Sequence, residues 1–233
     1  MKSRCLIIDC YYDERGAALN FEALLGDRPT QVVRAVFEEP PTDLSPFAAI
    51  FITGSKGCLS DLEPWMEALM ALIRRARDED VPLLGICFGH QAIACALFGT
   101  DAIRSAPLSE LGWETIRVAS PNPLFEGLSR EFVCFLSHFD EVSPDLEELE
   151  VFAHTDRCPV QAYQVRGRRI WGVQFHPEMD PAESEALVRS NLARHSTLEN
   201  DPEAILGRRL DGRALGRRIF ESFLRLTQGP SRT

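Results

Sequence analysis

The sequence has no excess of positive charge and no long apolar run, and these two absences exclude several classes of function. Acidic residues outnumber basic ones by 35 to 25, which gives a formal net charge of -10. A chain this acidic is not expected to form the broad basic surface that binds nucleic acid or anionic membranes non-specifically. No stretch approaches the roughly 18 apolar residues of a membrane span, and the first apolar run is too short for a secretory signal. We therefore expect a cytoplasmic protein that binds neither nucleic acid nor membrane.

Signals for disulfide bonds and metal sites are also missing. The seven cysteines include no C-x-x-C pair, and the five histidines include no pair spaced four residues apart. An odd number of scattered cysteines predicts neither a disulfide framework nor a zinc knuckle. We expect no metal ion and no cofactor. With 45% hydrophobic residues and no internal repeat, the 233-residue chain can form one globular core.

Short apolar runs alternate with amphipathic segments through the first hundred residues. This alternation predicts an α/β fold, an open and mainly parallel (mixed) sheet with helices on both faces. Ligands bind at the carboxyl ends of the strands in such sheets, so residues 54–55 and Cys87, each just past a strand, are expected on one rim. The expected strands are 6–8, 31–37, 48–53 and 81–86, and the expected helices are 16–25, 63–77 with Asp61 as its cap, and one that begins near Gly89.

The residue pattern changes after Gly99, where the apolar runs become shorter and richer in β-branched residues. This pattern predicts a partly antiparallel continuation of the sheet. The expected strands there are 113–118, 132–136, 151–153, 160–165 and 170–175, with a turn at 167–169 and a helix over 181–195.

The remaining C-terminal residues form an amphipathic segment. We expect one domain over residues 1–195 and a helical extension over 196–233 that packs on the same domain, because apolar residues recur there at roughly helical spacing. A surface for oligomerisation is the alternative, and the oligomeric state stays open. The loops 10–20, 54–64 and 100–112 are expected to frame the binding pocket.

Cys87 lies at a predicted strand-to-helix turn, within Gly85-Ile-Cys87-Phe-Gly89. Flanking glycines allow the sharp backbone bend that presents a nucleophile to a cleft. The positive end of a helix dipole also favours a thiolate. The pattern therefore predicts a nucleophilic cysteine, and a buried packing residue is the alternative.

A cysteine nucleophile needs a base, and the base needs an acceptor that orients it. His176-Pro177-Glu178, directly after the predicted strand 170–175, supplies both groups within three residues. A structural histidine is the alternative for His176 taken alone. Together the two segments predict a cysteine nucleophile with a base and an acceptor that orients the base.

The two segments resemble the paired signatures of the class I, triad-type glutamine amidotransferases. The resemblance rests on Gly85-Ile-Cys87-Phe-Gly89-His-Gln91 and Gly172-Val-Gln-Phe-His176-Pro-Glu178, and it extends to Thr53-Gly54-Ser55, Leu136-Ser-His138-Phe-Asp140-Glu-Val142 and Gln161-Ala-Tyr163. It covers roughly residues 1–190. Within the family the chain is similar to the amidotransferase domain of GMP synthetase, as a stand-alone member with the flavodoxin-like fold of the family.

The resemblance implies a role for each matching residue. Cys87 would form a γ-glutamyl thioester with glutamine, His176 would transfer protons, and Glu178 would orient His176. The backbone N–H groups of Phe88 and of the loop at Gly54 and Ser55 would hold the oxyanion. Gln91 would hold the substrate, and Ser137, His138 and Asp140 would reach its amino-acid head group, with Asp140 suited to the ammonium.

Two departures from the family leave the function open. Many members carry a second glycine where this chain has Ser55, so a backbone donor there requires a φ that suits serine. The sequence also contains no P-loop and no ATP-binding synthetase segment. Three functions remain open. The chain is a stand-alone enzyme acting on glutamine or a γ-glutamyl compound, a glutaminase subunit that passes ammonia to a separate synthetase, or a γ-glutamyl peptidase. A non-catalytic regulatory module, or a cysteine-dependent chaperone or hydratase on a related sheet, fits the residues less well.

Overall fold

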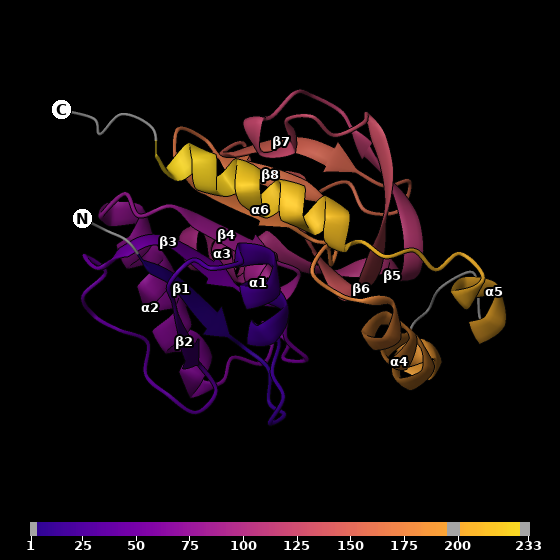
Figure 1. The fold of residues 1–233 in the computed structure, drawn as a ribbon, viewed down its shortest axis with the longest axis horizontal. Coiled ribbons are helices and arrows are strands. Elements are labelled where there is room, and N and C mark those ends of the chain that lie inside the picture. The colour runs from indigo at the N-terminus through magenta and orange to yellow at the C-terminus, as the bar shows by residue number, and fades with distance from the viewer. Residues whose placement is uncertain (1–3, 195–200, 229–233) are drawn as a thin grey trace.

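A computed structural model describes residues 4–194 and 201–228 of the chain. They form a nine-stranded mixed sheet in the order β2-β1-β3-β4-β9-β8-β7-β5-β6 (Figure 1). The first five strands in this order are parallel, namely β2 (Thr30–Arg34), β1 (Arg4–Asp9), β3 (Phe47–Ile52), β4 (Leu83–Ile86) and β9 (Ile170–Val173). The others pair antiparallel, namely β8 (Ala162–Val165), β7 (Leu149–His154), β5 (Ile103–Val118) and β6 (Glu131–Val142). The predicted α/β fold with a mixed sheet is confirmed.

Helices cover both faces of the parallel half of the sheet, as predicted. The side chains of β1 alternate between the two faces, as strand geometry requires. Leu6 and Ile8 belong to one hydrophobic cluster with α2 (Pro64–Asp78) and α3 (Phe88–Phe98). Cys5 and Ile7 belong to a second cluster, which holds α1 (Ala18–Leu25) and α6 (Arg213–Thr227). The central strands are therefore buried on both sides.

The antiparallel half is larger than the sequence predicts. Strand β5 begins at Ile103, so the expected pocket loop 100–112 is wrong over most of its length. Strand β6 continues to Val142, six residues past the expected 132–136. The register of these two strands shifts between Ser105 and Glu110. The residues between Ser105 and Glu110 have no paired partner in the ladder, and they interrupt the alternation from which a long strand is predicted. Pro107 is one of them, and it has no N–H to donate to a neighbouring strand.

Two expected boundaries also change. Helix α2 begins at Pro64 with Glu63 at its N-cap and no side-chain cap, so Asp61 does not cap it. Proline at the first helical position already fixes φ and lacks an N–H that would need an acceptor. The expected strand 31–37 ends at Arg34, where Phe37 N donates to Arg34 O in a turn.

The C-terminal part of the chain contributes to the core. Helix α4 (Pro181–Asn191) and the turn η3 (Leu192–Arg194) replace the expected helix 181–195, whose last residue lies outside the described residues. Helix α5 (Pro202–Leu206) lies beside α4, and α6 lies along one face of the sheet next to α1 (Figure 1). The apolar side of α6 is therefore covered by the chain itself.

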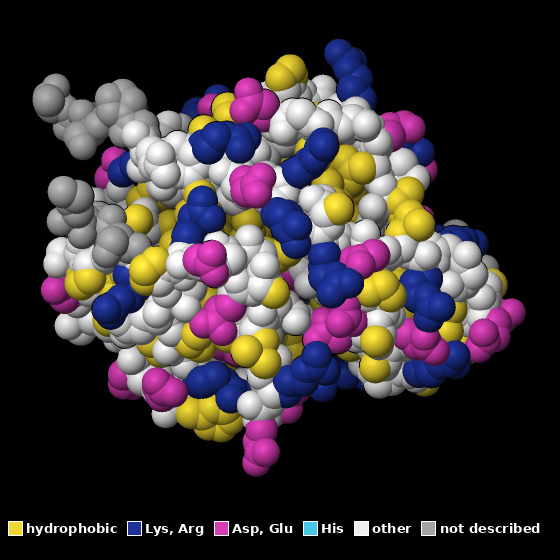
Figure 2. All heavy atoms as spheres, viewed as in Figure 1, with side chains coloured by type: hydrophobic (Ala, Val, Ile, Leu, Met, Phe, Trp, Pro, Cys, Tyr) yellow, Lys and Arg dark blue, Asp and Glu magenta, His cyan; other side chains and the backbone are white. Residues whose placement is uncertain are grey.

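The surface carries charges of both signs. On the face shown in Figure 2, cationic and anionic side chains are interspersed rather than gathered into patches of one sign. Among the described residues no helix combines the length and the apolar character that crossing a bilayer requires.

Phe220 of α6 provides a test of this packing. It is fully buried and contacts the rings of Phe21 and Phe51, with centroid distances of 5.3 Å and 4.9 Å. We expect Phe220→Ala to lower the free energy of unfolding by about 3–5 kcal/mol, because it leaves a cavity. Leu19→Ala, at a position 66% exposed on α1, should change it by less than about 0.5 kcal/mol. Urea denaturation measures both, and equal small losses would contradict the core role of α6.

Candidate active site

Cys87 occupies the turn between β4 and α3 with an unusual backbone. Its φ of 51° and ψ of -106° place it in a region that L-residues rarely adopt. In the described part of the chain only Asp80 shares a positive φ among residues other than glycine. The Cys87 N–H donates to Val173 O at 2.8 Å, which ties the turn to β9. The predicted strand-to-helix elbow is therefore present, and it is strained.

The two glycines of the motif are required for space. A Cβ at Gly85 would lie 2.4 Å from the Gly89 backbone, and a Cβ at Gly89 would lie 2.5 Å from Ile52 O. Both distances are too short for real atoms. The glycines thus let α3 start close against the sheet, which brings Cys87 to the rim.

The sheet order brings the second segment of the predicted site next to Cys87. Strands β3, β4 and β9 are neighbours, and Gly54, Cys87 and His176 follow their carboxyl ends. The imidazole Nδ1 of His176 lies 2.8 Å from Glu178 Oε1, and both side chains are buried. Because a carboxylate only accepts, Nδ1 carries the proton. The other nitrogen, Nε2, is then the one available to a thiol.

Gly54 shows how closely these groups approach. A Cβ added at Gly54 would lie 3.1 Å from His176 Cε1 and 3.7 Å from Cys87 Cβ. Burial on its own would lower the pKa of His176, but the adjacent Cys87 and Glu178 outweigh burial and raise this pKa to about 10. The ring is therefore an imidazolium at neutral pH, beside the sulfur of Cys87. Such a pair can act as nucleophile and proton donor in acyl transfer.

Gln91 and the segment 137–140 form a second wall. Gln91 Nε2 donates to Asp140 O at 2.7 Å and to Gln174 Oε1 at 3.0 Å. A carbonyl only accepts, which fixes the orientation of the Gln91 amide. The Cys87 thiol lies 3.8 Å from Ser137 O. The Asp140 carboxylate accepts from the thiol of Cys58 at 3.2 Å.

These groups line one cleft with a volume of about 250 Å³, which is near the lower end of small-molecule sites. It includes the predicted residues Ser55, Cys87, Phe88, Gln91, Ser137, His138, Asp140 and His176. Glu178 lies behind His176. Helix α4 and the following turn add Leu187, Asn191 and Arg194, whose guanidinium lies over the Phe139 ring.

Comparison with known proteins decides the family. Residues 7–194 match the family model described as glutamine amidotransferase class-I. The chain belongs to the class I glutamine amidotransferase family. The expected cysteine-dependent amidohydrolase is thereby confirmed as its enzyme class.

The chain is similar in sequence to GMP synthases of other organisms. The chain is 38% identical over 139 residues to a subunit of the glutamine-hydrolysing GMP synthase of Methanocaldococcus jannaschii, and the match covers 60% of this chain and 73% of that protein. It is 37% identical over 122 residues to the GMP synthase of Clostridium perfringens, which covers 52% of this chain. The matched stretch spans 24% of the Clostridium protein.

Solved structures confirm the fold of this amidotransferase. A glutamine amidotransferase from Methylobacillus flagellatus superposes with a TM-score of 0.78 at 24% identity, covering 100% of this chain and 97% of the other. A second, from Thermotoga maritima, gives a TM-score of 0.79 at 17% identity and covers 98% of this chain and 100% of the other.

The sequence does not reveal Tyr11, which lines the same cleft. A Cβ at Gly54 would lie 3.4 Å from its hydroxyl. Burial raises the pKa of Tyr11, and the neighbouring Glu178 and Cys87 raise it further. Tyr11 therefore stays a neutral hydroxyl at the edge of the Cys87 and His176 pair. A tyrosine in a predicted loop carries no signal for this position.

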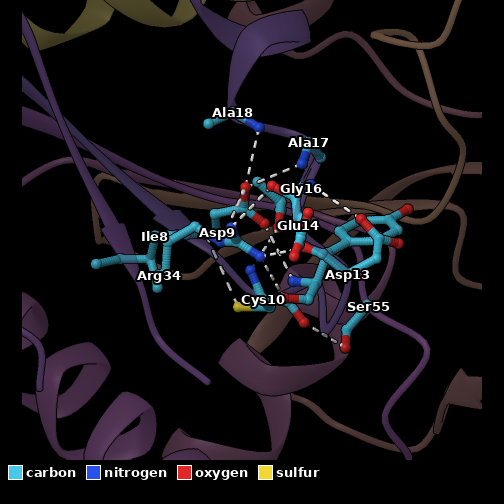
Figure 3. A network of polar contacts seen from close by, with 12 residues as sticks. Ile8, Asp9, Cys10, Asp13, Glu14, Gly16, Ala17, Ala18, Arg34 and Ser55 are labelled. Carbon is cyan, nitrogen blue, oxygen red and sulfur yellow. Dashed lines mark hydrogen bonds and ion pairs between the residues drawn. The ribbon is translucent and has the colours of Figure 1, made fainter. Parts of the chain in front are cut away.

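A buried carboxylate holds the loop that carries Tyr11 (Figure 3). Asp9 Oδ1 accepts from Tyr11 N at 3.1 Å, and Asp9 Oδ2 accepts from Ala17 N and Ala18 N at 2.9 Å and 3.1 Å. Arg34 reaches the same loop and donates to the carbonyl oxygens of Tyr11, Asp13 and Glu14. This network fixes one side of the cleft.

Ser55 suits its position. Its φ is not positive, since Asp80 and Cys87 are the described non-glycine residues with that feature. Its Oγ donates to Cys10 O at 2.7 Å and accepts from Gly57 N at 3.0 Å. The Ser55 hydroxyl therefore holds the loop after β3 through two hydrogen bonds that a second glycine could not form.

The expected pocket loops are partly correct. Residues 55–58 and Tyr11 line the cleft, whereas Ile103, Arg104 and Ser105 line a neighbouring hollow that Asp140 also borders. Residues 100–112 do not frame the cleft itself, because most of them belong to β5.

The charge on His176 predicts a pH dependence. Below its pKa of about 10 the ring holds the proton that a leaving nitrogen needs, and above it the proton is lost. Glu178→Gln removes a negative neighbour, so this pKa should fall. We expect the alkaline limb of kcat/KM to move down by at least about one pH unit in Glu178→Gln. Superimposable alkaline limbs in the two proteins would show that Glu178 does not tune His176.

The Asp9 network predicts unequal effects at two glycines with positive φ. A Cβ at Gly16 would lie 2.1 Å from Asp9 Oδ2, whereas nothing lies within 4 Å of one at Gly26. We expect Gly26→Ala to cost about 1–2 kcal/mol of stability from backbone strain. Gly16→Ala should cost about 1–3 kcal/mol more because it displaces a buried carboxylate, and it alone should lower kcat/KM. Urea denaturation and steady-state assays test this, and equal losses would exclude a special role for the network.

Proposed function

We propose that the chain hydrolyses the γ-carboxamide of glutamine, or the γ-glutamyl amide of a related compound, through a thioester on Cys87. The observation that carries the proposal is the strained thiol of Cys87 beside His176, whose Nδ1 is held by a buried Glu178. A nucleophile, a proton carrier and an orienting carboxylate are the parts that acyl transfer requires.

The first half of the reaction transfers the acyl group. The Cys87 thiolate attacks the amide carbon, and a C–S bond forms while the carbonyl electron pair moves onto oxygen. Two backbone groups are available for that oxyanion, the N–H of Phe88 in the first turn of α3 and an N–H of the Gly54–Ser55 loop. The C–N bond then breaks, and the His176 imidazolium gives its proton to the leaving nitrogen. Ammonia and a γ-glutamyl thioester result.

The second half releases glutamate. His176, now neutral at Nε2, removes a proton from water as the water oxygen attacks the thioester carbon. The tetrahedral species collapses, the C–S bond breaks, and the thiolate of Cys87 leaves. Glu178 stabilises the imidazolium that forms again. The cycle consumes water and glutamine and yields glutamate and ammonia.

The cleft wall supplies contacts for the amino-acid head group. The amide nitrogen of Gln91 is occupied by Asp140 O and Gln174 Oε1, so its carbonyl oxygen is the part that can accept from a substrate. The carboxylate of Asp140 borders the same space and suits an ammonium. A cleft of about 250 Å³ fits an amino acid better than a nucleotide.

Two destinations for the ammonia fit these features. A stand-alone enzyme would release it, and a glutaminase subunit would pass it to a separate synthetase. The resemblance to proteins that are named as one subunit of GMP synthase favours a synthetase partner. The complete Cys87, His176 and Glu178 set favours catalysis over a purely regulatory module.

The test is release of glutamate and ammonia by the purified chain from glutamine and from a panel of γ-glutamyl amides and dipeptides. We expect turnover of glutamine that Cys87→Ala abolishes, and trapping of a γ-glutamyl adduct on Cys87 in rapidly acid-quenched samples seen by mass spectrometry. Cys95→Ala is the matched control, since that thiol is also buried on α3 but lies outside the cleft.

Two results would decide between the alternatives. Faster turnover of a γ-glutamyl dipeptide than of glutamine would make the chain a γ-glutamyl peptidase. Turnover that survives in Cys87→Ala would refute the proposed thioester.

A further inference from the structure

A buried polar cluster lies behind the wall of the cleft formed by residues 137–140. At its centre are Glu110 of β5, 1% exposed, and His138 of β6, 3% exposed. His138 Nε2 lies 2.8 Å from Glu110 Oε2. Although His138 borders the cleft, its ring nitrogens have partners inside the protein, so its imidazole does not serve as a ligand for the head group.

The direction of the hydrogen bonds follows from the partners. His138 Nδ1 lies 3.0 Å from Asp140 O, and a carbonyl only accepts, so Nδ1 donates. Glu110 accepts from Thr155 Oγ1 at 2.7 Å and from Gln161 Nε2 at 2.6 Å. Glu110 Oε2 therefore has two partners, Gln161 Nε2 and His138 Nε2. The pair is therefore a buried hydrogen-bonded contact between β5 and β6.

The cluster connects to the substrate-facing Gln91 through the carbonyl group of Asp140. Asp140 O accepts from His138 on one side and from Gln91 Nε2, at 2.7 Å, on the other. The pairing of β5 with β6 is also interrupted here, since the register passes from Ser105 opposite Asp140 to Glu110 opposite His138. The backbone ladder between β5 and β6 is therefore irregular at this segment. Two side chains, His138 and Gln91, hydrogen-bond to the backbone of this segment at Asp140 O.

We propose that Glu110 is a positioning residue that sets the substrate-binding wall of the cleft before glutamine arrives. Its carboxylate holds His138, His138 holds the Asp140 carbonyl, and that carbonyl orients the amide of Gln91. The inference rests on the proposed function. A wall that is already ordered binds its ligand more tightly, because the loss of conformational entropy on ordering does not reduce the binding free energy. Loss of Glu110 should therefore weaken glutamine binding and spare the chemistry at Cys87.

A metal ion is the competing explanation for the cluster. Donor atoms of Glu110, His138 and Cys158 lie within 4.8 Å of one another. Burial raises the pKa of the Cys158 thiol, and the charge of Glu110 raises it further. A thiol that keeps its proton is a poor metal ligand. Cys158 thus separates the two explanations, since the hydrogen-bonded pair does not need it.

The first experiment measures binding of L-glutamine to chains that carry Cys87→Ala, so that no turnover occurs. We expect Glu110→Ala to raise the dissociation constant at least tenfold in calorimetry. Glu110→Gln should stay within about threefold, because its amide can donate to His138 Nε2 while the Gln161 amide rotates. The Gln161 amide can rotate without losing a hydrogen bond at Oε1, because Oε1 has no hydrogen-bond partner. Cys158→Ala is the matched control and should leave binding unchanged.

The second experiment uses chains with Cys87 intact. We expect Glu110→Ala to raise KM at least tenfold and to change kcat less than threefold. Alkylation of Cys87 by iodoacetamide, followed on its peptide by mass spectrometry, should proceed at the wild-type rate. If Glu110→Ala does not fold, Glu110→Met fills the same space without a charge and should give the same KM.

Three outcomes would overturn the proposal. Unchanged binding in Glu110→Ala would do so, as would equal losses in kcat/KM and in Cys87 alkylation, which indicate general damage to the site. Stoichiometric metal in the purified protein that disappears in Cys158→Ala would replace the pair with a metal site. Failure of glutamine to bind the Cys87→Ala chain at all would instead refute the proposed function.

Discussion

The turn at Cys87 is the constraint on which the rest of the site depends. A non-glycine residue at positive φ costs free energy and persists only where the surroundings hold it. Here the holding groups are the hydrogen bond from Cys87 N to Val173 O and the close approach of Gly85, Gly89 and Ile52. The same three neighbouring strands, β3, β4 and β9, carry the Gly54 loop, the thiol and the imidazole. Strain at Cys87 and assembly of the site are therefore two results of one packing arrangement.

Buried carboxyl groups support this arrangement from two sides. Asp9 holds the loop that carries Tyr11, and Glu110 holds the segment that carries Asp140. Each carboxylate is almost fully buried and is compensated by several donors. A buried charge costs free energy unless it is hydrogen-bonded, so each network has one favourable geometry. These networks hold the two walls of the cleft, as the β4–α3 turn holds Cys87.

The sequence predicted some parts of the fold and site well and others poorly. The strand and helix on either side of Cys87 were predicted because continuous apolar residues, glycines and helical spacing agree there. The length of β5 was not predicted, because its register shift breaks the alternation between Ser105 and Glu110. The roles of Tyr11 and Glu110 were missed because neither belongs to a local motif. The Asp61 cap was wrong because α2 begins at Pro64, which places Glu63 and not Asp61 at the N-cap.

The sequence by itself determined the chemistry-bearing residues, their order and the local elbow, because these follow from short-range sterics and from residue type. Only the tertiary structure decided that β4 and β9, whose residues lie more than eighty positions apart, are neighbours. It also decided that the His138 imidazole turns towards Glu110 and that α6 completes the core against Phe51. The physical reason is that strand order, side-chain partners and burial depend on long-range packing, in which each contact is chosen by the free energy of the whole arrangement.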